Sequence, residues 1–575
     1  MQILKKKPTN GVHAYIPELE DLFRKGRITR REFLRNATLL GMSLASASAF
    51  LASCAPKPTP TATPKPVVAA PTATPKPTAT PKPAGPPRGG TLTYGTRVMG
   101  IDHPARYSWI SGDADITRFV IEYLIYTDEN NISQPVLAER WEASDDLKTW
   151  TLHLRKGVTW TTGEPFNADD VVFTMNEWLN PDVGSSVLGL MSYLQPANIE
   201  KKDDHTVVLH LDSPQIGVAI HLHHYPSPIL DHRTFEGDWL ENPVGTGPFT
   251  LEEWSVGERA VLKARKEGYW KKGVDGKPLP YLDEIICVDL GEERTAYVSA
   301  MKGGQIDVFY PEVSDFQALK DDPNVGIASI PTTQTRVLRM RVDMEPWTDV
   351  RVRNAVKLCQ DREKILKLAF FGEGITGPDC HVSPVHPEFC PMEPTPYNPE
   401  KAKALLAEAG YPDGLDVTIT VASGWPDVVS YAETLKQDAE AAGLRITINA
   451  IPVSAYWDVW TEADFAVTPW THRALAVMVL PLAYTCDKEG TPVPWNESRW
   501  CDEEFDELLT KAMGTLDLED RRKLMCDIQR IQVERGSIGI PFWKNTWIAY
   551  NPKFKGMTAH PTQYNDNWIE VWKES

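Results

Sequence analysis

The stretch LDVTITVASGWPDVVSYAETLKQDAEAAGLRITINAI, residues Leu415–Ile451, decides the fold class. Alternating apolar residues predict strands over Leu415–Val421 and Leu444–Ile451. Between them, Pro426–Ala442 carries apolar residues on one helical side, and Gly443 is expected to end that helix. A strand–helix–strand order indicates a parallel sheet with a right-handed crossover, whose ligands lie beyond the carboxyl ends of the strands. We therefore expect an α/β fold.

The same signals extend outward in both directions along the chain. Asn398 and Pro399 are expected to begin a helix that Gly410 ends. Asn167 can cap a helix that starts at Ala168. We also predict strands over Thr91–Tyr94, Trp150–Leu154 and Val207–Leu211, a helix over Asp115–Tyr126, and a glycine-rich crossover at Val244–Pro248.

The charge of the 575-residue chain is distributed unevenly. Residues 1–88 hold 14 Lys and Arg against 4 Asp and Glu, whereas residues 89–575 hold 46 against 74. A strongly acidic body disfavours a nucleic-acid partner, because such a surface needs clustered Lys and Arg to displace counterions.

The basic leader is typical of an export signal. A twin-arginine pattern at Thr29–Leu34 precedes a weakly apolar stretch, Ala37–Leu51, and small residues up to Cys54. We predict that residues 1–54 form a twin-arginine lipoprotein signal peptide, with Cys54 as the lipidated residue. An Ala-rich helix with a buried Cys is the alternative.

Residues 55–88 follow as a Pro/Thr-rich linker, in which PTATPKP occurs three times. Proline fixes φ and lacks an amide donor, so this segment is expected to form an extended stalk without helix or sheet. Together, the leader and stalk predict an exported protein anchored by its N-terminal lipid to the outer face of the cell membrane.

A family resemblance rests on three adjoining segments: NISQPVLAERW (Asn131–Trp141), LKTWTLHLRKGV (Leu147–Val158) and GEPFNADDV (Gly163–Val171). Further matches occur at Pro243–Phe249, Asp349–Ala355, Asp361–Glu363 and Lys401–Pro412. In these segments the chain resembles the family 5 extracellular solute-binding proteins, the peptide-, opine-, sugar- and nickel-binding components of ABC importers. The resemblance runs from about Gly89 to the end.

The resemblance implies a periplasmic binding protein-like two-lobe fold (type II, cluster C) with an extra domain. Carried over to this chain, lobe I comprises residues 89–121, 241–330 and 547–575, the extra domain 122–240, and lobe III 331–546. A monomer is then expected to capture a small solute between its lobes by hinge closure, without a cofactor, and to deliver it to ABC permease and ATPase subunits.

The loop Trp470–Ala476 bears on the choice of ligand. Peptide-binding members resemble one another in a Trp-x-x-Asp-Tyr-x-Asp-Pro loop, whose first Asp pairs with the amino terminus of the ligand. Here the acid is missing, and His472 and Arg473 stand near its place. Arg473 offers a planar fork of donors that suits a carboxylate, and His472 adds a further donor. An interdomain salt bridge of Arg473 is the alternative.

Aromatic side chains are further candidates for ligand contact, because they supply large contact areas at low entropic cost. Trp470 lies in the ligand loop itself. The others near expected strand ends are Tyr107, Trp109, Trp425, Trp495 and Trp500, and for each of these core packing is the competing interpretation.

The cysteines of an exported chain favour disulfides. We predict the pairs Cys380–Cys390 and Cys486–Cys501, and treat Cys287, Cys359 and Cys526 as buried apolar groups. A zinc site made by Cys380, His381, His386 and Cys390 is the alternative for the first pair. Alternation places His221 and His223 on one face of a strand, beside His224, and we expect no metal there.

Enzymatic function is the competing class. The sequence contains no Gly-x-Ser-x-Gly elbow, His-Glu-x-x-His, phosphate loop or Gly-x-Gly-x-x-Gly, so we expect no catalytic activity. A secreted hydrolase remains compatible with the leader. Within the family, a peptide, an opine or another amino-acid-derived solute is expected, with an oligosaccharide or a metal chelate as the alternative.

Overall fold

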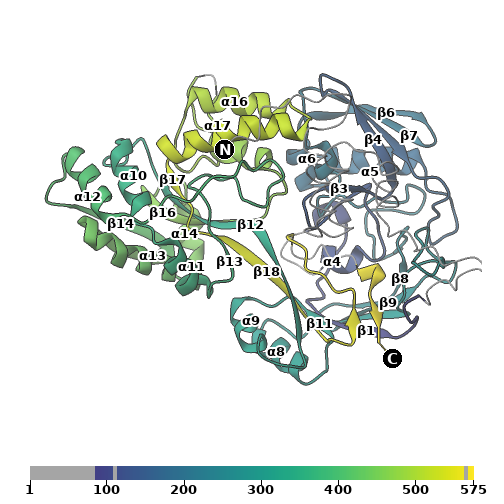
Figure 1. Ribbon diagram of the computed structural model, residues 1–575. Helices are drawn as coiled ribbons and strands as arrows, with labels where there is room; N and C mark the ends of the chain where they lie inside the picture. The colour runs from purple at the N-terminus through teal and green to yellow at the C-terminus, as the bar shows by residue number, and fades with distance from the viewer. Residues whose placement is uncertain (1–84, 108–112, 488, 563–567, 575) are drawn as a thin grey trace, which may run out of the picture. The chain divides into compact units, whose positions relative to one another are not determined.

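Two long strands, β12 (Gly326–Met340) and β18 (Trp543–Tyr550), lie side by side in the main sheet, as Figure 1 shows. The computed structural model describes residues 85–107, 113–487, 489–562 and 568–574. The predicted signal peptide with Cys54, most of the predicted linker, and Trp109 fall outside these ranges.

The main sheet of the described residues has twelve strands. Its order is β15-β14-β16-β12-β18-β11-β1-β10-β9-β8, with β13 beside β18 and β17 beside β12. These strands are β1 (Thr91–Gly95), β8 (Phe249–Ser255), β9 (Arg259–Ala264), β10 (Glu284–Val288), β11 (Val308–Phe309), β13 (Gly374–Ile375), β14 (Leu415–Ala422), β15 (Leu444–Ile451), β16 (Phe465–Trp470) and β17 (Ile538–Gly539).

The predicted strand–helix–strand unit is confirmed. Strands β14 and β15 pair in parallel from Leu415 opposite Leu444 to Ala422 opposite Ile451. Helix α13 (Pro426–Ala439) and a 3-10 turn (Glu440–Ala442) connect them, and Gly443 closes the turn with φ at 81°. Strand β16 joins β14 on its other side, also in parallel. Three carboxyl strand ends therefore meet at one edge of the sheet.

A separate four-stranded sheet lies between β1 and β8 in the sequence. Its order is β4-β5-β7-β6, formed by β4 (Ala138–Ala143), β5 (Thr149–Leu154), β6 (Leu194–Asp203) and β7 (Thr206–Leu211). Helix α5 (Ala168–Leu179) contacts β6, and Asn167 caps it as predicted, with Asp170 completing a capping box. Two small pairs are β2 (Ile125–Thr127) with β3 (Ser133–Pro135), and β19 (Phe554–Lys555) with β20 (Trp572–Lys573).

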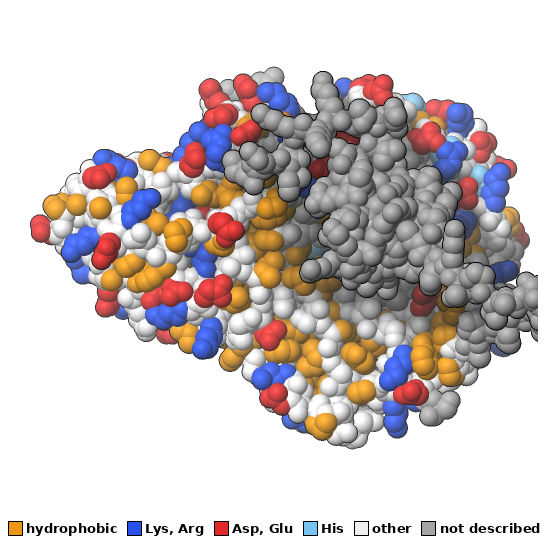
Figure 2. Space-filling view, in the orientation of Figure 1, with side chains coloured by type: hydrophobic (Ala, Val, Ile, Leu, Met, Phe, Trp, Pro, Cys, Tyr) orange, Lys and Arg blue, Asp and Glu red, His pale blue; other side chains and the backbone are white. Residues whose placement is uncertain are grey.

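The remaining α-helices cover the sheets or connect their strands. They are α4 (Asp113–Thr117), α6 (Ser186–Leu190), α7 (Val218–His221), α8 (Arg294–Lys302), α9 (Val313–Leu319), α10 (Val350–Leu358), α11 (Arg362–Phe370), α12 (Pro399–Glu408), α14 (Val453–Val459), α15 (Leu480–Ala483), α16 (Glu503–Met513) and α17 (Leu518–Arg535). None of the described helices combines the length and the hydropathy that a membrane crossing requires. Acidic and basic side chains are interspersed over the surface around α10, α12 and α13 (Figure 2).

The helix predicted over Asp115–Tyr126 is wrong beyond its first turn, because α4 ends at Thr117. The carbonyls of Phe119 and Val120 instead accept hydrogen bonds from the amides of Phe249 (3.1 Å) and Gly247 (2.9 Å). These carbonyls approach so closely that a Cβ on Gly247 would lie 2.6 Å from Phe119 O. The predicted glycine-rich crossover therefore ends this helix by competing for its carbonyls.

The strand predicted through His221 and His223 is also wrong. His221 is the last residue of α7, and His223 and His224 lie in the turns that follow. Alternating polarity over so few residues does not distinguish a strand from a single helical turn.

Candidate functional site

The carboxyl edge of β14, β15 and β16 carries the residues with the strongest claim to ligand contact. Trp425 follows β14 and precedes α13, and α14 follows β15. Trp470 is the last residue of β16, and Arg473 lies in the loop that follows this strand. Because ligands of parallel sheets lie beyond this edge, the fold places these side chains where a solute would bind.

A chain of aromatic rings runs along this edge. Trp425 contacts Tyr456 and Trp457, with ring centroids 5.2 and 5.4 Å apart. Further contacts link Trp457 to Trp460 (5.7 Å), Trp460 to Trp495 (6.1 Å) and Trp495 to Trp470 (6.0 Å). Trp457 and Trp495 are 43% and 47% exposed, so the chain presents an aromatic surface to solvent.

A buried ion pair fixes Trp470 at the end of β16. The indole Nε1 of Trp470 donates to Glu497 Oε1 at 2.9 Å. The other carboxylate oxygen lies 2.9 Å from Arg339 Nε and accepts from the Thr468 hydroxyl at 2.5 Å. Burial raises the pKa of Glu497, whereas Arg339 opposes that rise. Strands β12 and β16 are thereby tied to the segment that contains Glu497.

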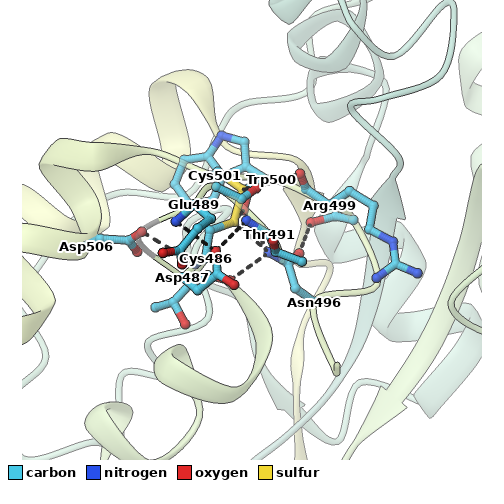
Figure 3. Close-up of a disulfide and its surroundings, with 12 residues drawn as sticks. Cys486, Asp487, Glu489, Thr491, Asn496, Arg499, Trp500, Cys501 and Asp506 are labelled. Carbon is cyan, nitrogen blue, oxygen red and sulfur yellow. Dashed lines mark hydrogen bonds between the residues drawn. A yellow bond between two sulfur atoms is a disulfide. The ribbon is translucent and has the colours of Figure 1, made fainter. Parts of the chain in front are cut away.

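That segment is closed by the disulfide between Cys486 and Cys501, which is the pair predicted from the sequence (Figure 3). Asn496 stabilises its turn by donating to the carbonyls of Trp500 (2.8 Å) and Thr485 (3.2 Å). Trp500 itself is 4% exposed and packs on Phe505, so it has a core role. The disulfide thus constrains the loop that supplies Trp495 and Glu497.

His472 connects the ligand loop to two distant parts of the chain. Its Nδ1 accepts from the Thr333 amide at 3.2 Å, and its Nε2 donates to Asn131 Oδ1 at 3.0 Å. Burial lowers the pKa of His472 well below its ordinary value, and the neighbouring His560, His386 and Arg473 act in the same direction. The imidazole is therefore uncharged at neutral pH.

Arg473 is a half-buried cation that pairs with no Asp or Glu of the described residues. Its backbone is held by Thr333, whose hydroxyl accepts from the Arg473 amide at 2.7 Å. Nη1 donates to Thr471 Oγ1 (2.8 Å) and to His472 O (3.0 Å). Within the described ranges, no Asp or Glu oxygen lies within 4.0 Å of its guanidinium, so the alternative of an interdomain salt bridge is not realised there. Burial lowers the pKa of Arg473, with Tyr225 opposing.

The expected Cys380–Cys390 disulfide is wrong, and so is the expectation that Cys526 is an unpaired apolar group. Cys390 pairs with Cys526 on α17, with Cα atoms 5.1 Å apart, and Cys380 is a buried free thiol. Gln529 fixes this arrangement, because its amide accepts from Cys390 N and donates to Cys390 O, both at 2.8 Å. The partner lies 136 residues away in sequence, and local spacing contains no signal for it.

The zinc alternative for the same segment is not assembled either. His381 Nδ1 lies 2.7 Å from the Tyr484 hydroxyl. His386 Nδ1 accepts from the Ser383 amide at 2.9 Å, and its Nε2 donates to the Arg473 carbonyl at 3.0 Å. Both ring nitrogens of His386 are therefore engaged, and Nε2 holds the backbone of the ligand loop.

In the described part of the chain, one group of ligand atoms could share an ion: Asp170, Asp231 and His232, within 4.8 Å of one another. Asp170 already accepts from Trp160 Nε1 (3.0 Å) and from Asn167 N (2.9 Å). Arg233 pairs with Asp231 at 2.6 Å. These contacts hold the first turn of α5 in place, so the three residues have a structural role.

A cavity of about 410 Å³ lies beside the segment that follows α4. Arg118, Glu122, Tyr126 and Trp270 are among the residues that line it. Glu122 is buried and accepts hydrogen bonds from the Tyr269 hydroxyl and from Trp270 Nε1, the latter at 3.1 Å. Burial is the largest effect on this carboxyl and raises its pKa from 4.5 to about 7.

We expect Glu122 to make the stability of the protein depend on pH. The unfolded chain releases this proton near pH 4.5, whereas the folded protein holds it to about pH 7. The resulting stabilisation is complete below pH 4.5 and is lost as the pH rises to 7. Over this range the free energy of unfolding should fall by about 3 kcal/mol. Urea unfolding of the wild type and of Glu122→Gln across this range should show the difference in unfolding free energy changing by that amount. Parallel pH profiles would contradict the prediction.

The structure brings Trp425, Trp470, His472, Arg473 and Trp495 to one edge of the sheet, whereas Tyr107 is buried elsewhere at 4% exposure. Sequence reasoning missed Trp457 and Trp460. Their place directly after the strand Leu444–Ile451 was the signal that would have found them. It also missed Arg118 and Asn131, which carry no local signal.

Comparison with known proteins gives concordant results. A family model described as "Bacterial extracellular solute-binding proteins, family 5 Middle" matches residues 133–482. Heme-binding protein A of Haemophilus influenzae is 27% identical over 470 residues, which cover 75% of this chain and 83% of that protein. The dipeptide-binding protein of Escherichia coli is 26% identical over 462 residues, covering 74% and 84%.

The structure of HbpA2 from Haemophilus parasuis has the same fold, with a TM-score of 0.75 at 24% identity over 84% of this chain and 100% of that chain. The family match spans more than half of the chain, and the expected two-lobe α/β fold is confirmed. The chain therefore belongs to the bacterial extracellular solute-binding proteins of family 5.

Proposed function

We propose that this protein is a lipid-anchored, extracytoplasmic solute-binding component of an ABC importer, and that its solute carries a carboxylate. The solute is a peptide, an opine or another amino-acid-derived compound. It is captured between the two lobes by hinge closure, and the closed form is delivered to the permease and ATPase subunits. Contacts that exist only in the closed state shift the population toward that state.

The observation that carries this proposal is Arg473. A desolvated guanidinium with no carboxylate within 4.0 Å among the described residues is costly unless a ligand supplies the anion. Nη1 already donates two hydrogen bonds to the ligand loop. The remaining donors, on Nε and Nη2, form a planar fork that matches the two oxygens of a carboxylate. The proteins named above are called heme-binding and dipeptide-binding, and both of those ligands carry carboxylates.

The membrane anchor rests on the sequence alone. Cys54 and its preceding segment fit a lipoprotein signal, and the Pro/Thr-rich linker would hold the binding protein away from the membrane. Two acyl chains or more give a stable anchor, unlike a single one. Two disulfides are consistent with folding in an oxidising compartment.

We expect Arg473→Ala to reduce affinity for the solute by about tenfold to a hundredfold, because a charge-assisted hydrogen bond contributes about 1.5–3 kcal/mol. Native mass spectrometry of freshly purified protein would identify the bound solute, and isothermal titration would measure its affinity for both proteins. Arg445→Ala is the matched control. Arg445 pairs with Asp416 where β15 and β14 begin, at the edge of the sheet away from the candidate site.

Unchanged affinity of the Arg473 variant would contradict the carboxylate assignment. Recovery of a chemically altered solute would favour a hydrolase and would overturn the binding function.

A further inference from the structure

A second arginine, Arg118, also pairs with no Asp or Glu of the described residues, and like Arg473 it acts on His224. Arg118 follows α4, and its guanidinium carbon lies 4.5 Å from the ring centre of Tyr123. Its Nε is buried and has no hydrogen-bond partner. No Asp or Glu oxygen of the described residues lies within 4.0 Å of its guanidinium.

The nearest polar neighbour of Arg118 does not satisfy it. Nη1 lies 3.1 Å from His223 Nε2. However, His223 Nδ1 accepts from the Thr127 amide at 2.9 Å, so Nε2 carries the ring hydrogen. The contact therefore sets two donors against each other, and the guanidinium retains its need for an acceptor.

Both arginines face one short segment, His223–Tyr225, from opposite parts of the chain. On one side, Arg118 contacts His223 and Tyr123, and the Tyr123 hydroxyl donates to Tyr225 O at 2.7 Å. On the other side, Arg473 interacts electrostatically with Tyr225 and with His224 of the same segment. His224, between these residues, has a pKa lowered to about 3 by burial, and both guanidinium groups add to that shift.

The groups around the two arginines do not neutralise them. Burial lowers the pKa of His386 and of His560 to about 4, and that of His472 further, so these imidazoles are uncharged at neutral pH. Asp128 also acts on His560, and Glu122 lines the same cavity as Arg118, but among the described residues neither carboxylate lies within 4.0 Å of either guanidinium. The acidic protein therefore holds a locally cationic site.

We propose that the solute carries two carboxylates, one bound by Arg473 and the other by Arg118. This inference rests on the proposed function, because it assigns the first carboxylate to Arg473. Arg118 and Arg473 are far apart in sequence. A dicarboxylate would therefore bridge two residues that only the folded chain brings together. Each guanidinium then gains the anion that its desolvated position requires.

The test uses linear dicarboxylates from succinate to azelate, each with its monomethyl ester, and measures affinity by isothermal titration. At least one diacid should bind the wild type about tenfold more tightly than its own monoester, because only the diacid engages both arginines. Arg118→Gln should abolish that preference while leaving the affinity for the monoester unchanged. Arg118→Lys keeps a cation and should keep part of the preference, which controls for lost packing on Tyr123.

Three outcomes would overturn the inference: no diacid binds, diacid and monoester bind equally, or the preference persists in Arg118→Gln. Binding of the monoester that falls in Arg473→Ala and is insensitive to Arg118 would leave the proposed function standing without the second carboxylate. Monoester binding that is unchanged in Arg473→Ala would count against both the proposed function and this inference.

Discussion

Replacing Glu497 with Ala is expected to lower the free energy of unfolding by about 3–5 kcal/mol, because it leaves the buried Arg339 without its counter-charge. The side chains of Arg339 and Glu497 are 0% and 2% exposed. Three donors converge on the carboxylate, from Arg339, Thr468 and Trp470. Truncation removes all of these contacts at once, and urea unfolding followed by Trp fluorescence would measure the loss.

Two controls separate the buried charge from the loss of a side chain. The double variant Arg339→Met/Glu497→Leu should recover much of the stability, because it removes both charges and keeps the volume. Asp416→Ala breaks the exposed pair with Arg445 and should leave unfolding close to the wild type. A loss below about 1 kcal/mol for Glu497→Ala would show that Arg339 finds another partner or water.

The same ion pair explains why this part of the site was only partly predictable. Local patterns identified β14, α13 and β15, because periodicity and the glycine that ends the helix are properties of adjacent residues. The family resemblance pointed to Trp470, His472 and Arg473, which lie at the end of β16 and directly after it. No local pattern indicates that Glu497 would be buried beneath Trp470, since that depends on a loop closed by a disulfide.

The failed predictions share the same cause. The helix over Asp115–Tyr126 had correct apolar spacing, but Gly247 and Phe249 take the carbonyls that would have continued it. Cys390 lay closer in sequence to Cys380 than to Cys526, yet Gln529 of α17 holds its backbone. In both places a contact made more than a hundred residues away in sequence outweighed a local preference.

Arg118 belongs to this class as well. It lies in a segment read as an ordinary amphipathic helix, and nothing in its neighbours along the chain marks it as functional. Its proposed role follows from the fold, which brings it into contact with His223, next to the residues with which Arg473 interacts. In the proposed site, two arginines lie among uncharged imidazoles inside an acidic protein.

Loss of the Cys390–Cys526 disulfide is expected to destabilise the protein more than loss of Cys486–Cys501. In the chain-entropy description, the constraint on the unfolded state grows with the closed loop, so 136 residues correspond to about 5 kcal/mol and 15 residues to about 3 kcal/mol. Thermal unfolding of the two Cys-to-Ser double variants would test this order. The single variant Cys390→Ser should behave like its double variant, because either one breaks the same bond.

The ligand loop should keep its geometry in these variants, although His386, which shortly precedes Cys390, donates through its Nε2 to the Arg473 carbonyl. Gln529 still bonds the backbone of residue 390 in the Ser variants, so local geometry would be retained and the loss would arise mainly in the unfolded chain. Wild-type protein treated with a thiol reductant should approach the stability of the variants, whereas the variants should not respond to the reductant. Equal destabilisation by the two pairs would argue that native contacts, and not loop length, determine what each disulfide contributes.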